Sequence, residues 1–163
     1  MQDIISRLRA KKEDEGFTLI ELLVVVVIIG VLVAIAVPVY LNYRQGAADK
    51  AAQSDLRGAV SAIEQFYTNN SNQYPAAIAA DTAGDANGKV DLKLGTTTIS
   101  QVNVSDGTRV GLANNGSTYV ICARNTNGTS AGTITKMYVY NSNGGSVKTS
   151  TSSTMATCLS SGV

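Results

Sequence analysis

The chain has 163 residues, no histidine and two cysteines, and its 13 basic and 12 acidic residues nearly cancel. This balance argues against binding of nucleic acid through the phosphate backbone. Without histidine there is no Ser-His-Asp or Cys-His catalytic arrangement, and the commonest zinc ligand is missing. We therefore expect no enzyme and no cofactor, and one small domain of roughly 90 to 120 residues beside an apolar segment.

Residues 1–15 are charged and have no apolar periodicity, so they cannot form part of a core. Four basic residues lie between positions 7 and 12, before a long apolar run, and the first basic residue after it is Arg44. Positive charge concentrates on the cytoplasmic side of a membrane helix. The pattern therefore predicts a cytoplasmic N-terminus and export of the chain beyond Tyr43.

The apolar run extends from Phe17 to Tyr43, and no charged residue lies between Leu22 and Tyr43. As a helix it is long enough to cross a bilayer, and it is too long for a cleaved signal peptide. We interpret it as a retained anchor. Glu21 is the exception, because a charge at the centre of a membrane helix costs about 3 kcal/mol even on the mildest scale. Glu21 therefore requires a partner.

The helical pattern continues to Thr68 and becomes amphipathic after residue 46. Gly30 and Pro38 weaken the helix, and Pro38 is expected to kink or loosen it. The apolar positions at spacings of three and four are Ala52, Leu56, Ala59, Val60, Ile63, Phe66 and Tyr67. The opposite face, expected to be solvated, carries Lys50, Asp55, Arg57 and Glu64.

Beyond the helix, a loop is predicted at 69–88, because this segment is marked by Asn, Pro75 and Gly. Strands are predicted at 97–104, 108–113, 118–124 and 133–140, and their short connections favour an antiparallel meander. Tyr119, Ile121 and Ala123 are expected on one face of the sheet. The tail from Ser146 to Val163 is predicted to be loose unless Cys158 is bonded.

The two cysteines, Cys122 and Cys158, both lie on the side expected to be exported. A disulfide is favoured there, and two unpaired buried thiols are the alternative. The bridge would close a loop of 37 residues, counting both cysteines, and would fasten the C-terminal tail to the domain.

The segment around Asp85 partly resembles a calcium-binding loop, with Asp81 and Asp91 nearby. It lacks the first ligand, where Ala83 stands, and the closing glutamate, where Leu94 stands. A solvated turn is favoured, and an irregular calcium site is the alternative.

The segment GFTLIELLVVVVIIGVLVAIAVP, residues 16–38, resembles the N-terminal signature of type IV prepilins. The resemblance implies an α+β fold, with one long N-terminal α-helix packed on a small antiparallel β-sheet. It also implies three regions: a leader at 1–16, a transmembrane or filament-core half of the helix at 17–43, and an exported globular domain at 44–163.

The resemblance further implies that a prepilin peptidase cuts between Gly16 and Phe17 and methylates the new amine of Phe17. Glu21 would pair with the Phe17 amine of a neighbouring subunit, and buried pairs of this kind suit a role in setting register. Some filaments of the family have a helix unwound between a glycine and a proline placed like Gly30 and Pro38.

The implied partners are other copies of the chain in a helical polymer, the peptidase, the assembly platform and motor, and the membrane. The implied location is the cytoplasmic membrane and then an extracellular pilus. One alternative is a pseudopilin of a secretion or competence system, but the pair Cys122 and Cys158 favours a pilin. Another alternative is an anchored adhesin or receptor domain that does not polymerise.

Overall fold

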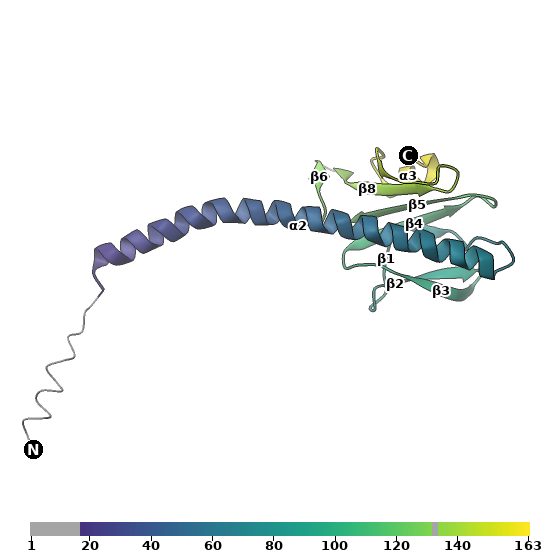
Figure 1. Cartoon of the computed structure of the whole chain (residues 1–163), viewed down its shortest axis with the longest axis horizontal. Coiled ribbons are helices and arrows are strands. Elements are labelled where there is room, and N and C mark those ends of the chain that lie inside the picture. The colour runs from purple at the N-terminus through teal and green to yellow at the C-terminus, as the bar shows by residue number, and fades with distance from the viewer. Residues whose placement is uncertain (1–16, 132–133) are drawn as a thin grey trace, which may run out of the picture. The chain divides into compact units, whose positions relative to one another are not determined.

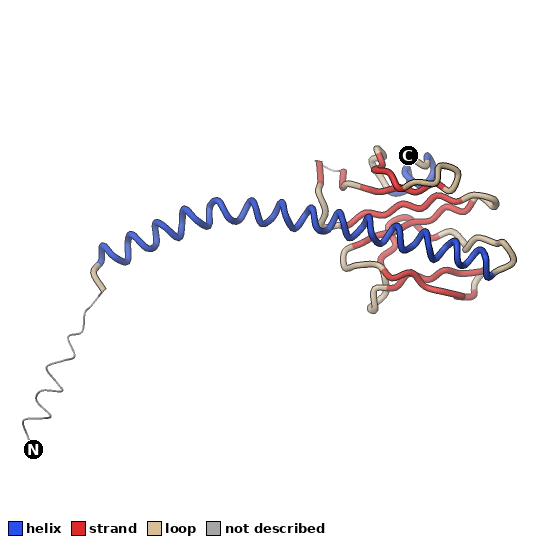
Figure 2. Tube along the Cα trace, viewed as in Figure 1, coloured by secondary structure: helices blue, strands red, loops and turns tan. Residues whose placement is uncertain are grey.

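The computed structural model describes residues 17–131 and 134–163, and Figures 1 and 2 show how its helices and strands follow one another. The predicted leader, residues 1–16, lies outside the described residues. The chain divides after Tyr40 into two units.

The first long element is α2 (Leu19–Asn69), a single helix that continues through both Gly30 and Pro38. Every residue from Phe17 to Ala47 is exposed. Further along, one side of the helix is buried, at Asp49, Ala52, Leu56, Ala59, Ile63 and Phe66. The predicted amphipathic pattern is therefore confirmed, although Val60 and Tyr67 are only partly buried.

The helix ends at a run of polar residues, because their conformations close its last turn. Ser71 and Asn72 have positive φ angles of 53° and 59°, and the Asn72 N–H donates to the Tyr67 carbonyl. The Asn70 side chain donates to the Phe66 carbonyl at 2.7 Å. Asparagine tolerates this left-handed conformation better than most residues, so the NNSN sequence acts as the C-terminal cap.

The main sheet has five antiparallel strands in the order β1-β4-β5-β8-β9. They are β1 (Ile78–Ala83), β4 (Thr108–Asn114), β5 (Tyr119–Asn125), β8 (Met137–Asn141) and β9 (Val147–Ser150). Two smaller antiparallel pairs are β2 (Lys89–Leu94) with β3 (Thr97–Asn103), and β6 (Ser130–Ala131) with β7 (Ile134–Thr135). A short helix, α3 (Met155–Ser161), follows the last strand.

Both faces of the main sheet are covered. The face toward α2 contributes Tyr119, Ile121 and Ala123 to a core shared with the buried side of the helix, as predicted. The second half of α2 lies across this face in Figure 1. The opposite face packs against α3 through a second core, made by Val120, Cys122, Met137, Val139, Met155 and Cys158. The central strand β5 is consequently buried at nearly every position.

Gly111 in β4 allows α3 to approach the sheet closely. A Cβ added at this position would lie 2.8 Å from Leu159 Cδ1 of α3 and 3.2 Å from the backbone of Ala80 in β1. The absence of a side chain therefore makes room for both neighbours.

The predicted loop at 69–88 is partly wrong, because residues 78–83 within it form β1. This strand, IAADTA, has one large apolar residue and lies mostly exposed at the sheet edge, so its sequence carries little of the alternation that marks a strand. β2 was not predicted either, although Val90 and Leu92 alternate and are buried.

Two further expectations need correction. The strand predicted at 97–104 pairs with β2 instead of joining the meander, which is formed by β4, β5, β8 and β9. The tail from Ser146 to Val163 is ordered as β9 and α3, and Cys158 is bonded, which agrees with the prediction that the tail is loose only without that bond. The strand predicted at 133–140 is divided, with Lys136 between β7 and β8.

Candidate assembly site at the start of the long helix

Thr18 and Glu21 form a reciprocal cap at the first turn of α2. The Thr18 N–H donates to Glu21 Oε2 at 2.8 Å, and the Thr18 hydroxyl donates to the same oxygen at 2.6 Å. In return the Glu21 N–H donates to Thr18 Oγ1 at 3.3 Å. This is a capping box, in which the side chains satisfy amide groups that have no partner within the helix.

This contact was not predicted, although the sequence contains a signal for it. Thr-Leu-Ile-Glu before an apolar run has the spacing of a capping box. The carboxylate of Glu21 thus has a partner within its own chain. A carboxylate can accept about four hydrogen bonds, so one further donor can still bind.

The helix after this cap exposes an apolar surface on all sides. Phe17 is 84% exposed, and each residue through Tyr43 is exposed as well. By length and composition, α2 is apolar enough to cross a membrane. Contiguous apolar surface of this extent requires lipid or protein to cover it. This half of the helix is therefore a binding surface.

Gly30 and Pro38 lie within this surface, and the helix is continuous at both. A Cβ added at Gly30 would have no atom within 4 Å, so no contact in this chain requires a glycine there. Pro38 removes one backbone donor from the helix interior. The predicted unwinding between these residues stays a prediction.

In the globular unit, the predicted disulfide between Cys122 and Cys158 is present. It joins β5 to α3, and both residues are fully buried. No described cysteine is free.

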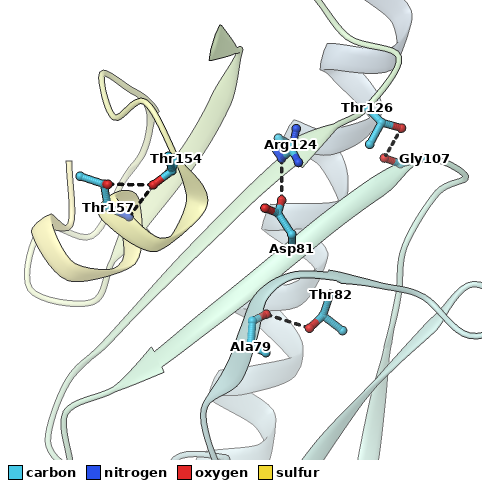
Figure 3. Close-up of polar contacts among 8 residues, drawn as sticks. All are labelled: Ala79, Asp81, Thr82, Gly107, Arg124, Thr126, Thr154 and Thr157. Atoms are coloured by element: carbon cyan, nitrogen blue, oxygen red, sulfur yellow. Dashed lines mark hydrogen bonds and ion pairs between the residues drawn. The ribbon is translucent and has the colours of Figure 1, made fainter. Parts of the chain in front are cut away.

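The three aspartates of the suspected calcium loop have separate partners. Asp81 accepts from Arg124 Nε at 2.6 Å, which links β1 to β5 (Figure 3). Asp85 accepts from the amides of the turn that follows it. Hydrogen bonds from Gln101 and Thr98 lower the pKa of Asp91, and Lys93 adds a weaker contribution.

Within residues 17–131 and 134–163, no group of three acidic or sulfur side chains is arranged to hold a metal ion. The three aspartates act instead as local hydrogen-bond acceptors. The favoured solvated turn thus agrees with the contacts of Asp85.

Comparison with protein families gives a match to the prokaryotic N-terminal methylation motif over residues 11–37. The match covers the apolar half of the helix as far as residue 37, the capping box and the predicted cleavage position. Gly16 itself lies outside the described residues.

Several curated proteins are similar to the chain. A fimbrial protein of Neisseria meningitidis is 37% identical over 103 residues, which cover 57% of this chain and 59% of that protein. A fimbrial protein of Pseudomonas aeruginosa is 35% identical over 95 residues, which cover 58% of this chain and 62% of that protein. The type II secretion system core protein G of Aeromonas hydrophila is 35% identical over 65 residues, which cover 40% of this chain and 45% of that protein.

In each case the similarity spans less than two thirds of the relative's length. No solved structure gave a significant match. The methylation motif, the long apolar helix packed on a small antiparallel sheet, and the fimbrial relatives all point to one family. The chain is thus similar to proteins of the type IV pilin family.

Proposed function

We propose that this chain is the structural subunit of a type IV pilus filament. The observation that carries the proposal is the apolar surface of α2 from Phe17 to Tyr43, which no other described part of the chain covers and which begins with the carboxylate of Glu21. A bilayer can cover the apolar side chains but offers poor solvation to a carboxylate. A bundle of the same helix from several subunits can cover the apolar side chains and also offer a partner to the carboxylate.

Processing is the first step of this proposal. A prepilin peptidase cuts between Gly16 and Phe17 on the cytoplasmic side and methylates the new amine. The cut places a positive charge one residue before Thr18, at the start of α2. Glu21 of one subunit then accepts from the Phe17 amine of a neighbour, in addition to or in place of Thr18.

The remaining steps follow from the same surface. The processed subunit leaves the membrane through an assembly platform driven by a motor, and the helices at 17–43 form the filament core. The domain at 44–163 lies outside. Gly30 and Pro38 provide the weak points at which the helix can unwind during this packing.

A pseudopilin is the second candidate, favoured by the similarity to core protein G of Aeromonas hydrophila. The disulfide and the fimbrial relatives favour the pilus subunit. An anchored adhesin that does not polymerise would have no use for Glu21. No catalytic activity is proposed.

Intact mass spectrometry of material sheared from the cell surface tests the proposal. We expect a species that starts at Phe17, is heavier by one methyl group, and is lighter by two hydrogens because of the disulfide. Gly16→Ser should leave the uncut precursor in the membrane. A wild-type chain that stays in the membrane and still begins at Met1 would sink the filament proposal.

Three variants separate the charge of Glu21 from its capping role. Glu21→Gln keeps a hydrogen-bond acceptor for Thr18 but loses the charge, since glutamine also completes a capping box. Thr18→Val removes the hydroxyl from the cap, leaves the backbone N–H of residue 18 as a donor to Glu21, and keeps the charge. Glu21→Ala removes the charge and both hydrogen bonds that the carboxylate accepts. Loss of one partner from a buried ion pair costs about 3 to 5 kcal/mol, or more than about a hundredfold in subunit affinity.

We therefore expect all three proteins in the membrane, little sheared filament from Glu21→Gln and Glu21→Ala, and a clearly higher yield from Thr18→Val. Immunoblots of the sheared and membrane fractions measure both quantities. Wild-type yield from Glu21→Gln would contradict the ion pair, and a neutral phenotype for Glu21→Leu would favour the anchored monomer.

A further inference from the structure

The sequence has asparagine directly before glycine at four places, and each is a candidate for spontaneous modification. They are Asn87–Gly88, Asn115–Gly116, Asn127–Gly128 and Asn143–Gly144. At such a pair, the glycine nitrogen can attack the asparagine side-chain carbonyl, because glycine has no Cβ to hinder the approach. Attack requires the N–H proton to leave and the two atoms to meet.

In the folded chain, the glycine N–H is hydrogen-bonded at all four pairs. Three have a backbone acceptor: Gly88 donates to the Asp85 carbonyl, Gly128 to the Asn125 carbonyl and Gly144 to the Asn141 carbonyl, at 2.9, 3.0 and 2.9 Å. The fourth differs, because the Gly116 N–H donates to a side chain, Asn114 Oδ1, at 2.7 Å. A side chain can rotate away without any change in the backbone of the turn.

The surroundings of Asn115–Gly116 also differ from those of the other pairs. Both residues are exposed at the turn between β4 and β5, and a Cβ added at Gly116 would meet no atom within 4 Å. Water therefore reaches the pair freely. The turn is otherwise held by two backbone bonds, from Asn115 N–H to the Thr118 carbonyl and from Ser117 N–H to the Asn115 carbonyl.

The other three glycines are held more firmly. Gly88 is half-buried, and its carbonyl accepts from the Val104 N–H. Gly128 is buried against the carboxylate of Asp49. Gly144 is exposed, but the Asn141 carbonyl holds both its N–H and that of Gly145.

The amide group of Asn114 makes two hydrogen bonds of its own. Its Nδ2 donates to the Pro75 carbonyl at 2.9 Å and to the Tyr74 carbonyl at 3.3 Å. These bonds orient Oδ1 toward the Gly116 N–H. The Asn114 side chain thus connects the loop after α2 to the turn. It also accepts a hydrogen bond from the Gly116 nitrogen, which is the atom that would attack Asn115.

We propose that Asn115 is the site of spontaneous deamidation in the folded chain, and that the Asn114 side chain sets its rate. The Gly116 nitrogen loses its proton and bonds to Asn115 Cγ, and the Asn115 amide leaves as ammonia. Water then opens the resulting five-membered ring at either carbonyl, giving aspartate or isoaspartate. The net change consumes one water, releases one ammonia, and needs no enzyme or oxidant.

The consequence is one added negative charge on the exposed turn between β4 and β5. When isoaspartate forms, the backbone also gains one extra carbon within this turn. The surface of the domain therefore changes with age.

Peptide mapping by mass spectrometry tests the proposal on the full chain in detergent, incubated at mildly alkaline pH. In the wild-type protein we expect the peptide that contains Asn115 to convert first among the four. Asn114→Ala removes the acceptor and should speed conversion at Asn115 several-fold, with the other three sites unchanged.

Asn114→Asp is the matched control. It loses the same bonds to the Pro75 and Tyr74 carbonyls but keeps an oxygen that can accept from the Gly116 N–H. We expect Asn115 to convert there at close to the wild-type rate. Earlier conversion at another pair in the wild type, or equal rates at Asn115 in the two variants, would overturn the proposal.

Discussion

Asp49 shows how one residue ties α2 to the loops of the globular unit. Its side chain is buried, it accepts from the Thr129 N–H at 3.0 Å, and Lys136 Nζ lies 4.0 Å from it. A buried carboxylate is tolerated only with such partners. Asp49 lies on the same buried side of the helix as Ala52 and Leu56. The helix therefore places its carboxylate at the edge of the core.

Gly128 allows Asp49 to reach this position, so a substitution of Gly128 should destabilise the domain. A Cβ at Gly128 would collide with the Asp49 carboxylate and lies 3.1 Å from the Asn125 carbonyl. We expect Gly128→Ala to destabilise the domain by about 1 to 3 kcal/mol, the usual cost of overpacking. Urea unfolding of the full chain in detergent, followed by circular dichroism, measures the change.

Gly58→Ala is the control for this prediction. Gly58 lies on the exposed side of α2, and an added Cβ would meet no atom within 4 Å. Alanine favours the helix by up to about 1 kcal/mol relative to glycine. Gly58→Ala should therefore stabilise, and equal effects of the two substitutions would refute the steric argument.

At the scale of elements, α3 is a short helix that two caps and a disulfide stabilise. A helix of seven residues is too short to be stable alone. The Thr154 hydroxyl accepts from the Thr157 N–H at 3.1 Å and caps its start (Figure 3), and Gly162 closes its end with a φ of 68°. Cys158 bonds it covalently to β5.

The disulfide should therefore dominate the stability of this region. We expect the double variant Cys122→Ser, Cys158→Ser to lose about 3 to 4 kcal/mol, the chain-entropy value for a loop of this size. Thr154→Ala removes only the cap and should cost about 1 kcal/mol. Urea unfolding measures both, and a double variant no less stable than Thr154→Ala would contradict this ranking.

At the scale of the whole globular unit, four tyrosines connect the end of α2 to the sheet. Ring centroids of Tyr67 and Tyr74 are 4.4 Å apart, those of Tyr74 and Tyr119 4.8 Å, and those of Tyr119 and Tyr140 5.7 Å. The Tyr119 hydroxyl donates to Glu64 Oε1 at 2.7 Å. Glu64 and Asp55 were expected only to face solvent, but Asp55 also accepts from the Ser105 N–H and hydroxyl.

This cluster makes the stability of the domain depend on pH in the alkaline range. Burial, and then the bond to Glu64, raise the pKa of Tyr119, and burial raises the pKa of Tyr74. An unfolded tyrosine ionises near pH 10, whereas folded Tyr119 keeps its proton. The unfolded state thus releases protons first, and the free energy of unfolding falls above about pH 10.

The expected slope is about 1.4 kcal/mol per pH unit for each tyrosine that keeps its proton in the folded state. Urea unfolding at several pH values above and below this point measures it. Tyr119→Phe should be less stable than the wild type at neutral pH but should lose less stability as the pH rises. Parallel curves for the two proteins would show that Tyr119 does not cause the dependence.

The sequence by itself determined the parts of this protein that depend on local pattern. The run from Leu22 to Tyr43, the spacing of Ala52, Leu56, Ala59, Ile63 and Phe66, and the alternation in β4 and β5 predicted the long helix and the centre of the sheet. The Thr18–Glu21 cap was also readable, since it depends on a spacing of three residues. Local patterns suffice where neighbours in sequence are neighbours in space.

Only the tertiary structure decided the rest. β1 forms because β4 offers its edge, and α3 forms because the second core and Cys122 hold it, so their own sequences predict neither. The positions of Asp49 beside Thr129 and of Asn114 beside Pro75 join residues 80 and 39 apart in the sequence. Such contacts exist only once the helix has packed on the sheet, because no local periodicity encodes a distance across the fold.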